Sequence, residues 1–416
     1  MNANEQLQTN TALREPNGTI TPHIACLVTP VLCLSGPHFW GRRHISAGIV
    51  LSLAVLAHLN SPFTNDIGVA QPWSLMWVFW LATIERLLFC ESGCPETSFW
   101  RIDRRPMEAK YMAPWSLAKL RWAAALIFNL RGIRWNWQVK NVLPTDETRR
   151  WHFVMRQSLR FFKYLTISDL LLQLAIRLFW TSPDGQVGGM NSKYLTIRHA
   201  HWGWSFVNTL VFGFGPYYFI NMQYIFASIV AVLFGISKPE DWSPLFGKLS
   251  QVTTVRSFWG QFWHQFIRRS VTSVSNWVLD SFAIPRGTVF SRYLQIWIAF
   301  GLSGFLHAQA NLMLPRPSNV TPDECVRGTM LYFLWQAAAI TFEDAVQWAW
   351  VKAGGTLHPP SRFRTLIGYA WVVCSFWISL PWAADDMMRM RLMEKSFLPF
   401  SFTQNLVRKV PIPPRS

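Results

Sequence analysis

The residue with the clearest chemical potential is a histidine near the end of a long apolar segment, IWIAFGLSGFLHAQANLML. His307 lies four residues after Ser303 and four before Asn311, so the three share one side of a helix. An ionisable side chain is costly to bury in such a segment, which makes function the default hypothesis. A neutral imidazole there could take a proton from a hydroxyl group. The alternative is a histidine that a neighbouring carbonyl satisfies structurally.

A second set of candidates lies in the segment RSFWGQFWHQFIRR at 256–269. Its spacing predicts a helix with one apolar face, which comprises Phe258, Trp259, Phe262, Trp263 and Phe266. The other side carries His264 and Arg268, which are four residues apart and could meet the anionic parts of a substrate. Trp263 would supply a flat apolar wall beside His264. A plain amphipathic helix at the membrane interface is the other interpretation.

Polar residues also recur in the apolar segment TMLYFLWQAAAITFEDAVQWAW. Gln336, Glu343 and Gln347 are spaced so that they line one helix face, and Asp344 adjoins it. Carboxylates inside an apolar segment must be paired, protonated or exposed to a water-filled cavity. A salt bridge to another helix and a role in substrate binding are therefore both open.

Motifs for other chemistries are lacking. His199 and His201 form an H-x-H pair without further ligands at metal-site spacing, and Cys90 and Cys94 have no second pair to complete a zinc set. The sequence therefore predicts no metal site. It also contains no Walker loop for phosphates, no GxSxG elbow of serine hydrolases and no GxGxxG dinucleotide fingerprint.

Composition predicts a membrane protein. Half of the 416 residues are hydrophobic and 15% are charged, against roughly 25% charged in soluble domains. The 24 tryptophans suit the bilayer interface, where an indole satisfies both its apolar body and its N–H group. The net charge of +17 comes from basic residues in loops between apolar runs, which is the positive-inside pattern rather than that of a nucleic-acid binder.

The apolar runs predict an all-α, polytopic integral membrane protein with about seven to nine transmembrane helices plus interfacial helices, since a span needs roughly 20 apolar residues. The runs lie at 24–35, 45–59, 73–90, 164–180, 204–235, 293–314, 328–351 and 366–384. We expect a single membrane-embedded domain over 24–398, a polar N-terminal segment at 1–23 and a mobile basic tail at 399–416. The first apolar helix is expected to act as an uncleaved signal.

The distribution of basic residues predicts the topology. The stretches 101–163 and 236–292 are expected on the cytoplasmic side, and within the first the segment 115–130 is expected to form an interfacial helix. The run at 204–235 contains glycines and Pro216, so it could be one tilted helix or two short ones. One helix is favoured because it keeps both basic stretches on the same face.

Two glycosylation patterns follow from the same topology. Three spans before the first basic stretch place the N-terminus in the lumen, where Asn17-Gly-Thr19 could be modified. Asn319-Val-Thr321 would then lie in a short luminal loop, close to a helix end and to Pro322. We therefore do not expect efficient modification of Asn319.

Two motifs in fixed order resemble those of a known family. FWGQFWHQ at 258–265 is followed about forty residues later by SGFLHA at 303–308. This combination resembles the wax synthase-like branch of the membrane-bound O-acyltransferase superfamily, in which an F-W-G-x-x-W block precedes a membrane-embedded S-G-x-x-H motif. Three further stretches resemble its filamentous-fungal members of the secondary-metabolite acetyltransferase type: RGIRWNWQVKN, WSPLFG and FEDAVQ. The resemblance runs from about residue 115 onward and is strongest over 115–350.

The chain departs from the family pattern at two positions. His264 stands where many members have asparagine, and Ala308 stands where glutamate often follows the histidine. We therefore expect His307 to act without an adjacent carboxylate.

The resemblance implies transfer of an acyl group from coenzyme A to an alcohol, with acetyl-CoA or another acyl-CoA as co-substrate and no tightly bound cofactor. It implies His307 and His264 as catalytic residues, with His307 as general base. Eight residues are expected to bind or position the substrates: Trp259, Trp263, Arg268, Ser303, Asn311, Gln336, Glu343 and Gln347. The fungal type favours acetylation of a terpenoid, meroterpenoid or other secondary metabolite. The expected partners are this lipophilic alcohol and membrane lipid, without nucleic acid.

Other functions remain open. A long-chain wax ester synthase would join a fatty acyl group to a long alcohol by the same chemistry. A transporter would also have many helices with a few polar residues, but transporters often show two related halves, and no internal repeat is evident. A structural membrane protein is disfavoured by the polar faces at 303–311 and 336–347. The expected location is the endoplasmic reticulum membrane, which the chain would cross several times.

Overall fold

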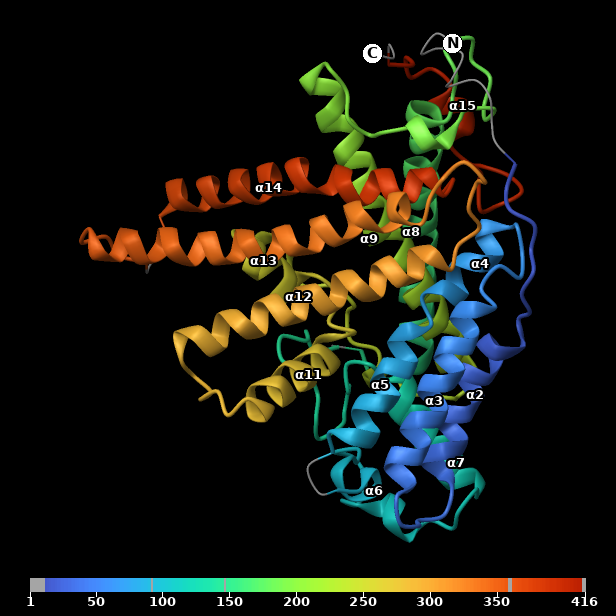
Figure 1. Ribbon diagram of the computed structural model, residues 1–416, viewed down its shortest axis with the longest axis vertical. Helices are drawn as coiled ribbons and strands as arrows, with labels where there is room; N and C mark the ends of the chain where they lie inside the picture. The colour runs from blue at the N-terminus through green and yellow to red at the C-terminus, as the bar shows by residue number, and fades with distance from the viewer. Residues whose placement is uncertain (1–11, 91–92, 146, 358–360, 414–416) are drawn as a thin grey trace. The chain divides into compact units, whose positions relative to one another are not determined.

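The computed structural model describes residues 12–90, 93–145, 147–357 and 361–413, which Figure 1 shows as a ribbon. Within these ranges the regular elements are helices, accompanied by isolated β-bridges and no β-strand, which confirms the predicted all-α class. The chain divides into two units: unit 1 is Met1–Arg14, Leu143–Trp263 and Pro315–Ser416, and unit 2 is Glu15–Val142 and His264–Leu314. The single domain over 24–398 concerns both units together and stays a prediction.

Unit 2 is built from helices of two separate parts of the chain. These are α2 (Thr21–Ser35), α3 (Arg42–Leu59), α4 (Ile67–Ser74), α5 (Trp77–Leu88), α6 (Pro95–Ser98), α7 (Leu117–Phe128), α11 (Arg268–Ser281) and α12 (Val289–Leu312). The helix predicted over 115–130 forms as α7, where Ser116 accepts a hydrogen bond from the backbone N–H of Lys119 and caps the helix. Trp122 and Leu126 on its inner face are buried. Its interfacial position stays a prediction.

A buried carboxylate holds four of these helices together. Glu96 of α6 accepts a hydrogen bond from Arg42 of α3 at 2.7 Å and lies 3.1 Å from the ammonium group of Lys119 on α7. Arg42 also donates to the carbonyls of Cys33 and Leu34 at the end of α2. Buried charges are tolerated here because they are paired and hydrogen-bonded.

Unit 1 contains the remaining long helices. They are α8 (Arg150–Phe179), α9 (Trp202–Leu233), α13 (Asp323–Lys352) and α14 (Arg362–Arg389), with the short helices α10 (Val255–Ser257) and α15 (Gln404–Val407) and the π-helix η5 (Phe258–Phe262). α8 packs along α9, as Figure 1 shows. α9 continues through Pro216 without a break, which confirms that the run at 204–235 is one helix.

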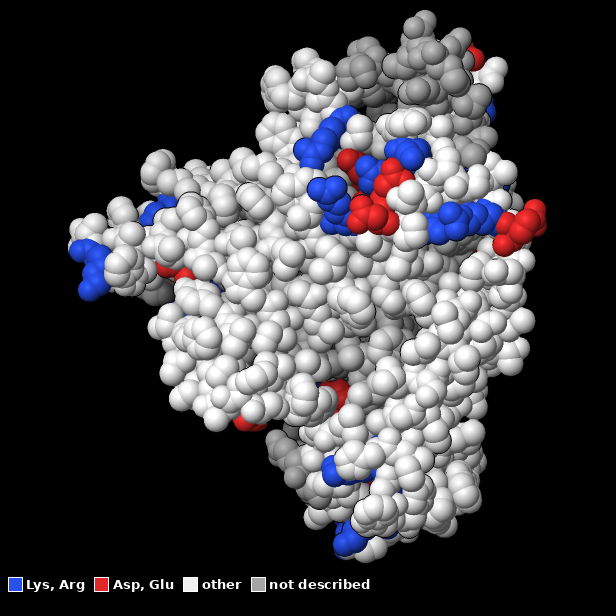
Figure 2. All heavy atoms as spheres, viewed as in Figure 1, with Lys and Arg blue, Asp and Glu red and all other residues white. Residues whose placement is uncertain are grey.

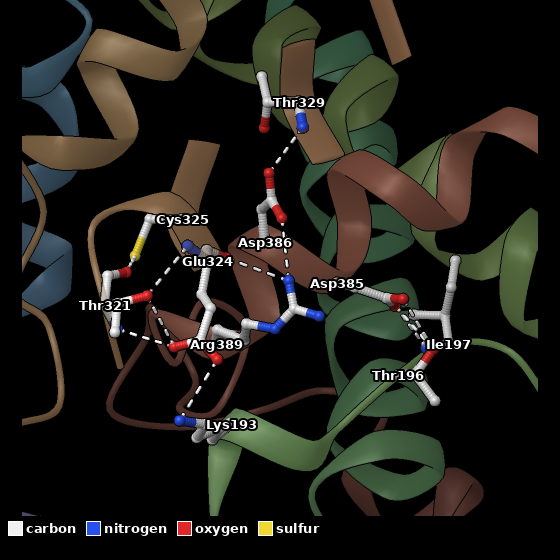
Figure 3. Close-up of polar contacts among 10 residues, drawn as sticks. All are labelled: Lys193, Thr196, Ile197, Thr321, Glu324, Cys325, Thr329, Asp385, Asp386 and Arg389. Carbon is white, nitrogen blue, oxygen red and sulfur yellow. Dashed lines mark hydrogen bonds and ion pairs between the residues drawn. The ribbon is translucent and has the colours of Figure 1, made fainter. Parts of the chain in front are cut away.

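Two consecutive aspartates fasten α13 and α14 within unit 1. The helices approach closely at Gly328, where an added Cβ would lie 2.1 Å from a carbonyl oxygen of α14. Asp386 accepts hydrogen bonds from the backbone N–H of Thr329 at 2.6 Å and from Arg389 at 3.0 Å (Figure 3). Asp385 accepts from a hydroxyl and a backbone N–H of the loop before α9. Both carboxylates therefore serve packing between helices.

Among the described residues, four helical segments are long and apolar enough to cross a membrane. They are Ile67–Leu88, Trp202–Leu233, Val289–Leu312 and Arg362–Arg389. The first consists of α4 and α5, which a turn separates. The predicted count of seven to nine spans is not confirmed. In Figure 2, charged side chains gather toward the two ends of α13 and α14 and are sparse between them, as expected for helices that lipid surrounds.

The single helix predicted over 256–269 is wrong. The chain forms α10 and η5, and Trp263 is extended with φ −67° and ψ 150°. The helix ends because the chain turns extended at Trp263, and the carbonyl of Phe262 accepts a hydrogen bond from the backbone N–H of Gly247. A new helix, α11, begins at Arg268. His264 and Arg268 therefore do not share a helix face.

The mobile C-terminal tail is also corrected as far as the structure describes it. Asp169 of α8 accepts hydrogen bonds from the hydroxyls of Ser401 and Thr403, each at 2.8 Å. Arg177 of the same helix donates to the carbonyl of Val410 at 2.9 Å. The segment is thus bound to α8 through a buried carboxylate, whereas 414–416 lie outside the described residues.

Candidate active site

His307 is held in one orientation by its own helix. It lies in the last turns of α12, and its Nδ1 atom is 2.7 Å from the carbonyl oxygen of Ser303, one turn earlier. A carbonyl oxygen can only accept a hydrogen bond, so Nδ1 carries the proton in the neutral ring. The lone pair then lies on Nε2, which is the atom able to take a proton from a substrate. The hydrogen bond to a neighbouring carbonyl is thus confirmed for His307, and its role as a base stays a prediction.

A tryptophan from another helix packs against this ring. Trp77, the first residue of α5, has its ring centroid 5.2 Å from that of His307, at an angle of 70° between the planes. Around the pair, α5 and α12 are packed through the buried side chains of Leu81, Leu306 and Ala310. The sequence offered no signal for Trp77, because it is one of several aromatic residues in an apolar run.

The polar face of α12 is present as predicted. Ser303 and Asn311 are both buried, and His307 between them is half-buried. The hydroxyl of Ser303 donates to the carbonyl of Ala299 at 2.7 Å, while its own carbonyl holds the histidine. Ser303 thus orients His307 through its backbone carbonyl, while its hydroxyl bonds to the backbone of its own helix.

His264 lies in the segment between η5 and α11, outside the four candidate spans. Burial, together with positive charge on His307 and on Arg131, lowers the pKa of His264 to about 3. The imidazole of His264 is therefore neutral at any physiological pH. Because charge on His307 affects the pKa of His264, the two rings lie near each other within unit 2, although about forty residues separate them in the chain.

Arg268 forms the first turn of α11 and faces a neighbour in its own segment. Its guanidinium donates to the side-chain carbonyl of Gln265 at 2.9 Å. Burial lowers the pKa of Arg268, which remains charged all the same. Arg268 therefore does not share a helix face with His264, and its predicted contact with the anionic part of a substrate stays a prediction.

In unit 1, the aromatic block of η5 is anchored to α13 and α14. The indole N–H of Trp259 donates to the side chain of Gln336 at 3.1 Å, and Gln336 is fully buried. Phe258 stacks on Trp263 with 5.4 Å between centroids and 22° between planes. Phe376 of α14 completes the cluster at 4.5 Å from Phe258. These rings form one aromatic cluster, and the predicted role of Trp263 as a wall of the substrate site stays a prediction.

Glu343 caps the start of this block. Its carboxylate accepts hydrogen bonds from the backbone N–H groups of Val255 and Arg256, and from the indole of Trp371 at 2.7 Å. The neighbouring Asp344 pairs with the Arg256 side chain at 2.6 Å. The bonding of Glu343 is that of a helix cap.

Gln347, one turn further along α13, is half-buried. Its predicted part in substrate binding stays a prediction, as it does for the other site residues. What the described contacts establish is the local setting of each side chain: a tautomer for His307, a neutral ring for His264 and an anchored aromatic wall at η5.

Two family models match parts of the chain. Residues 242–335 match the membrane bound O-acyl transferase family, and residues 149–233 match the C-terminal domain of aspirochlorine biosynthesis protein F. The first match contains η5 and His307, and it ends within α13. No solved structure matches the chain.

Three relatives carry the comparison further. Aspirochlorine biosynthesis protein F of Aspergillus oryzae is 46% identical over 233 residues, which are 56% of this chain and 90% of that protein. Acetyltransferase ple2 of Rhodocybe pseudopiperita is 31% identical over 64% of this chain and 66% of its own length. Acetyltransferase sirH of Emericella nidulans is 27% identical over 82% of this chain and 76% of its own. The chain therefore belongs to the membrane-bound O-acyltransferase family, is of the fungal secondary-metabolite acetyltransferase type, and is an acyltransferase enzyme.

Proposed function

We propose that the protein transfers an acetyl group from acetyl-CoA to a hydroxyl group of a terpenoid, meroterpenoid or other secondary metabolite, with His307 as general base. The observation that carries this proposal is the hydrogen bond from Nδ1 of His307 to the Ser303 carbonyl, which leaves the lone pair on Nε2. Relatives that are named acetyltransferases support the choice of an acetyl group over a longer acyl group.

The reaction needs one proton to be moved twice. Nε2 of His307 takes the proton of the acceptor hydroxyl as its oxygen attacks the thioester carbonyl. The carbon–sulfur bond then breaks, coenzyme A leaves as a thiolate, and the imidazolium returns the proton to sulfur. The new ester bond and the free thiol balance the equation without any further reactant. General-base assistance of this kind contributes typically ~10²–10⁴-fold in rate.

His264 has a different part in the proposal. Since burial lowers its pKa to about 3, the ring does not take up the substrate proton at neutral pH. A neutral imidazole can still donate or accept a hydrogen bond, so we assign it to positioning of the thioester or of the acceptor. This role suits the asparagine that many family members have here, because an amide also donates and accepts.

The aromatic wall of η5 supports a lipophilic acceptor. Trp263 directly precedes His264 in the chain, and Phe258 and Phe376 extend its apolar surface in unit 1. A fused-ring acceptor would stack on flat indole and phenyl faces. A long-chain alcohol would use the same surface less specifically, so wax ester synthesis is the second candidate.

The proposal also places the protein in the endoplasmic reticulum membrane with its basic stretches in the cytoplasm. The side-chain amide N–H of Asn319 donates to Asn191 at 3.0 Å, which supports the expectation that this site is not glycosylated. Acetyl-CoA would reach the site from the cytoplasmic side.

Expression in yeast microsomes tests the function. Acetyl-CoA and palmitoyl-CoA are each offered with a panel of alcohols, and release of the coenzyme A thiol is measured alongside ester formation. We expect acetyl esters of a polycyclic terpenoid alcohol and no palmitoyl transfer to hexadecanol. Hexadecyl palmitate as the main product would establish the wax synthase alternative, and no thiol release from either donor would contradict both.

A further inference from the structure

Unit 2 contains a buried group of charges that the proposed chemistry at His307 does not use. Glu85, in the last turn of α5, lies 2.9 Å from the guanidinium of Arg269 and 3.4 Å from that of Arg86. Glu85 and Arg86 are each 1% exposed, whereas Arg269, in the first turn of α11, is 24% exposed. The three residues come from two helices that pack together in unit 2 and stand side by side in Figure 1.

The charges of this group do not cancel. Both arginines make their described ion pairs with the same carboxylate, so two positive charges face one negative charge. Aromatic rings pack against the two guanidinium groups. The ring centroid of Trp137 lies 4.6 Å from the Arg86 guanidinium and 5.2 Å from that of Arg269, and the centroid of Phe99 lies 5.2 Å from that of Arg269. Cation–π contacts offset only a part of the cost of a buried charge. The group is one anion short of neutrality.

Two further features raise the positive electrostatic potential around Arg86 and Arg269. The Nε–H of Arg86 is buried and has no hydrogen-bond acceptor among the described residues. α11 begins without a side-chain cap and without an acidic residue in its first turn, where Arg268 stands next to Arg269. The partial positive charge of a helix N-terminus therefore adds to the guanidinium charges.

We propose that Arg269, supported by Arg86 and Trp137, binds the phosphate groups of the acyl-CoA donor. This inference rests on the proposed function. A guanidinium binds a phosphate through two parallel N–H bonds, and Arg269 is the exposed member that such a ligand can reach. Glu85 and Trp137 contact the Arg269 guanidinium and hold it in place, and the phosphate supplies the missing negative charge. The site lies at the end of a candidate span, as the polar end of a donor that delivers its thioester into the membrane requires.

The test compares two donors: acetyl-CoA, and acetyl-pantetheine, which lacks the whole 3′-phosphoadenosine diphosphate part and therefore every phosphate. For Arg269→Gln we expect the KM for acetyl-CoA to rise ~10–100-fold, because the variant loses a charged hydrogen-bonded pair with the phosphate. We expect kcat to stay within about threefold of wild type. The KM for acetyl-pantetheine stays unchanged, because that donor never used the site. Arg269→Lys keeps the charge but loses the two-bond geometry. Its KM for acetyl-CoA should lie between those of wild type and Arg269→Gln.

Arg286→Gln is the matched control. Arg286 pairs with Asp280 on the exposed surface beyond α11, in the same unit, and both side chains are 57% exposed. We expect this variant to leave both KM values as they are. An equal rise of KM for both donors in Arg269→Gln would overturn the inference, since the site would then not distinguish phosphate.

Phospholipid headgroups carry the same phosphate chemistry, so the assay is repeated in nanodiscs with and without anionic lipid. An Arg269→Gln defect that appears only with anionic lipid would assign the site to lipid and overturn the inference. Binding of adenosine 3′,5′-bisphosphate, measured calorimetrically on wild type and on Arg269→Lys, tests the site without turnover. Wild-type protein that binds the bisphosphate but transfers no acetyl group would contradict the proposed function alone, and the absence of bisphosphate binding would contradict this inference.

Discussion

At the scale of single residues, the proton on Nδ1 of His307 decides what the ring can do. Because that proton is committed to the Ser303 carbonyl, Nε2 is the basic atom. His307→Ala should therefore reduce kcat by ~10²–10⁴-fold, while the protein still accumulates in the membrane. His44→Ala, at an exposed histidine of the same unit, is the control and should be fully active. Activity of His307→Ala within threefold of wild type would exclude a general base at this position.

His264 calls for two substitutions rather than one. If the ring positions a substrate by a hydrogen bond, His264→Asn should retain more activity than His264→Ala, since the amide can replace a neutral imidazole. The measurement is kcat and KM for acetyl-CoA and for the acceptor, each normalised to the amount of membrane-inserted protein. Equal loss in both variants would show that the imidazole itself is required.

The lowered pKa of His264 also predicts a pH dependence of stability. Between about 3 and 6.5 the unfolded chain binds a proton at this residue that the folded protein does not bind. Stability contributed by the neutral ring is therefore complete above pH 6.5 and declines as the pH falls below it. In detergent, the melting temperature of His264→Asn should fall less between pH 7 and pH 5 than that of wild type. Parallel curves for the two proteins would contradict the burial of a neutral ring.

At the scale of elements, Glu343 fixes where the aromatic block begins. Its carboxylate serves two backbone N–H groups and one indole, so Glu343→Gln loses charge-assisted hydrogen bonds worth together ~2–4 kcal/mol. We expect a lower melting temperature and a lower kcat, since η5 would no longer be held against α13. Asp344→Asn weakens the partly exposed pair with Arg256 and should cost less than about 1 kcal/mol. Similar melting temperatures for the two variants would contradict the capping role.

At the scale of the whole molecule, the side of the membrane on which the basic stretches lie decides how acetyl-CoA enters. Single cysteines at Tyr111 and Ser250, both exposed, report on the two stretches. Cys374 is exposed and must first be replaced by serine to remove background labelling. We expect both new cysteines to react with an impermeant maleimide from the cytosolic side of sealed microsomes. Labelling of Ser250→Cys only after the luminal side is opened would overturn the predicted topology.

The sequence by itself determined the all-α class of the molecule and singled out His307 as the candidate base. In lipid the backbone polar groups must be hydrogen-bonded within the protein, and apolar runs of roughly 20 residues satisfy this as helices. The same rule made a histidine inside such a run conspicuous, and the spacing of Ser303, His307 and Asn311 follows from helical periodicity alone. One continuous helix at 204–235 followed from the charge of its flanks.

Tertiary structure alone decided where regular spacing stops and which distant charges meet. Helical periodicity continued through 256–269, but the chain is extended at Trp263, where the preceding Phe262 carbonyl accepts a hydrogen bond from Gly247. Periodicity is a local property and cannot report a competing partner from elsewhere in the chain. Likewise Glu85 and Arg269 are 184 residues apart, and only packing of α5 against α11 makes one carboxylate serve two arginines.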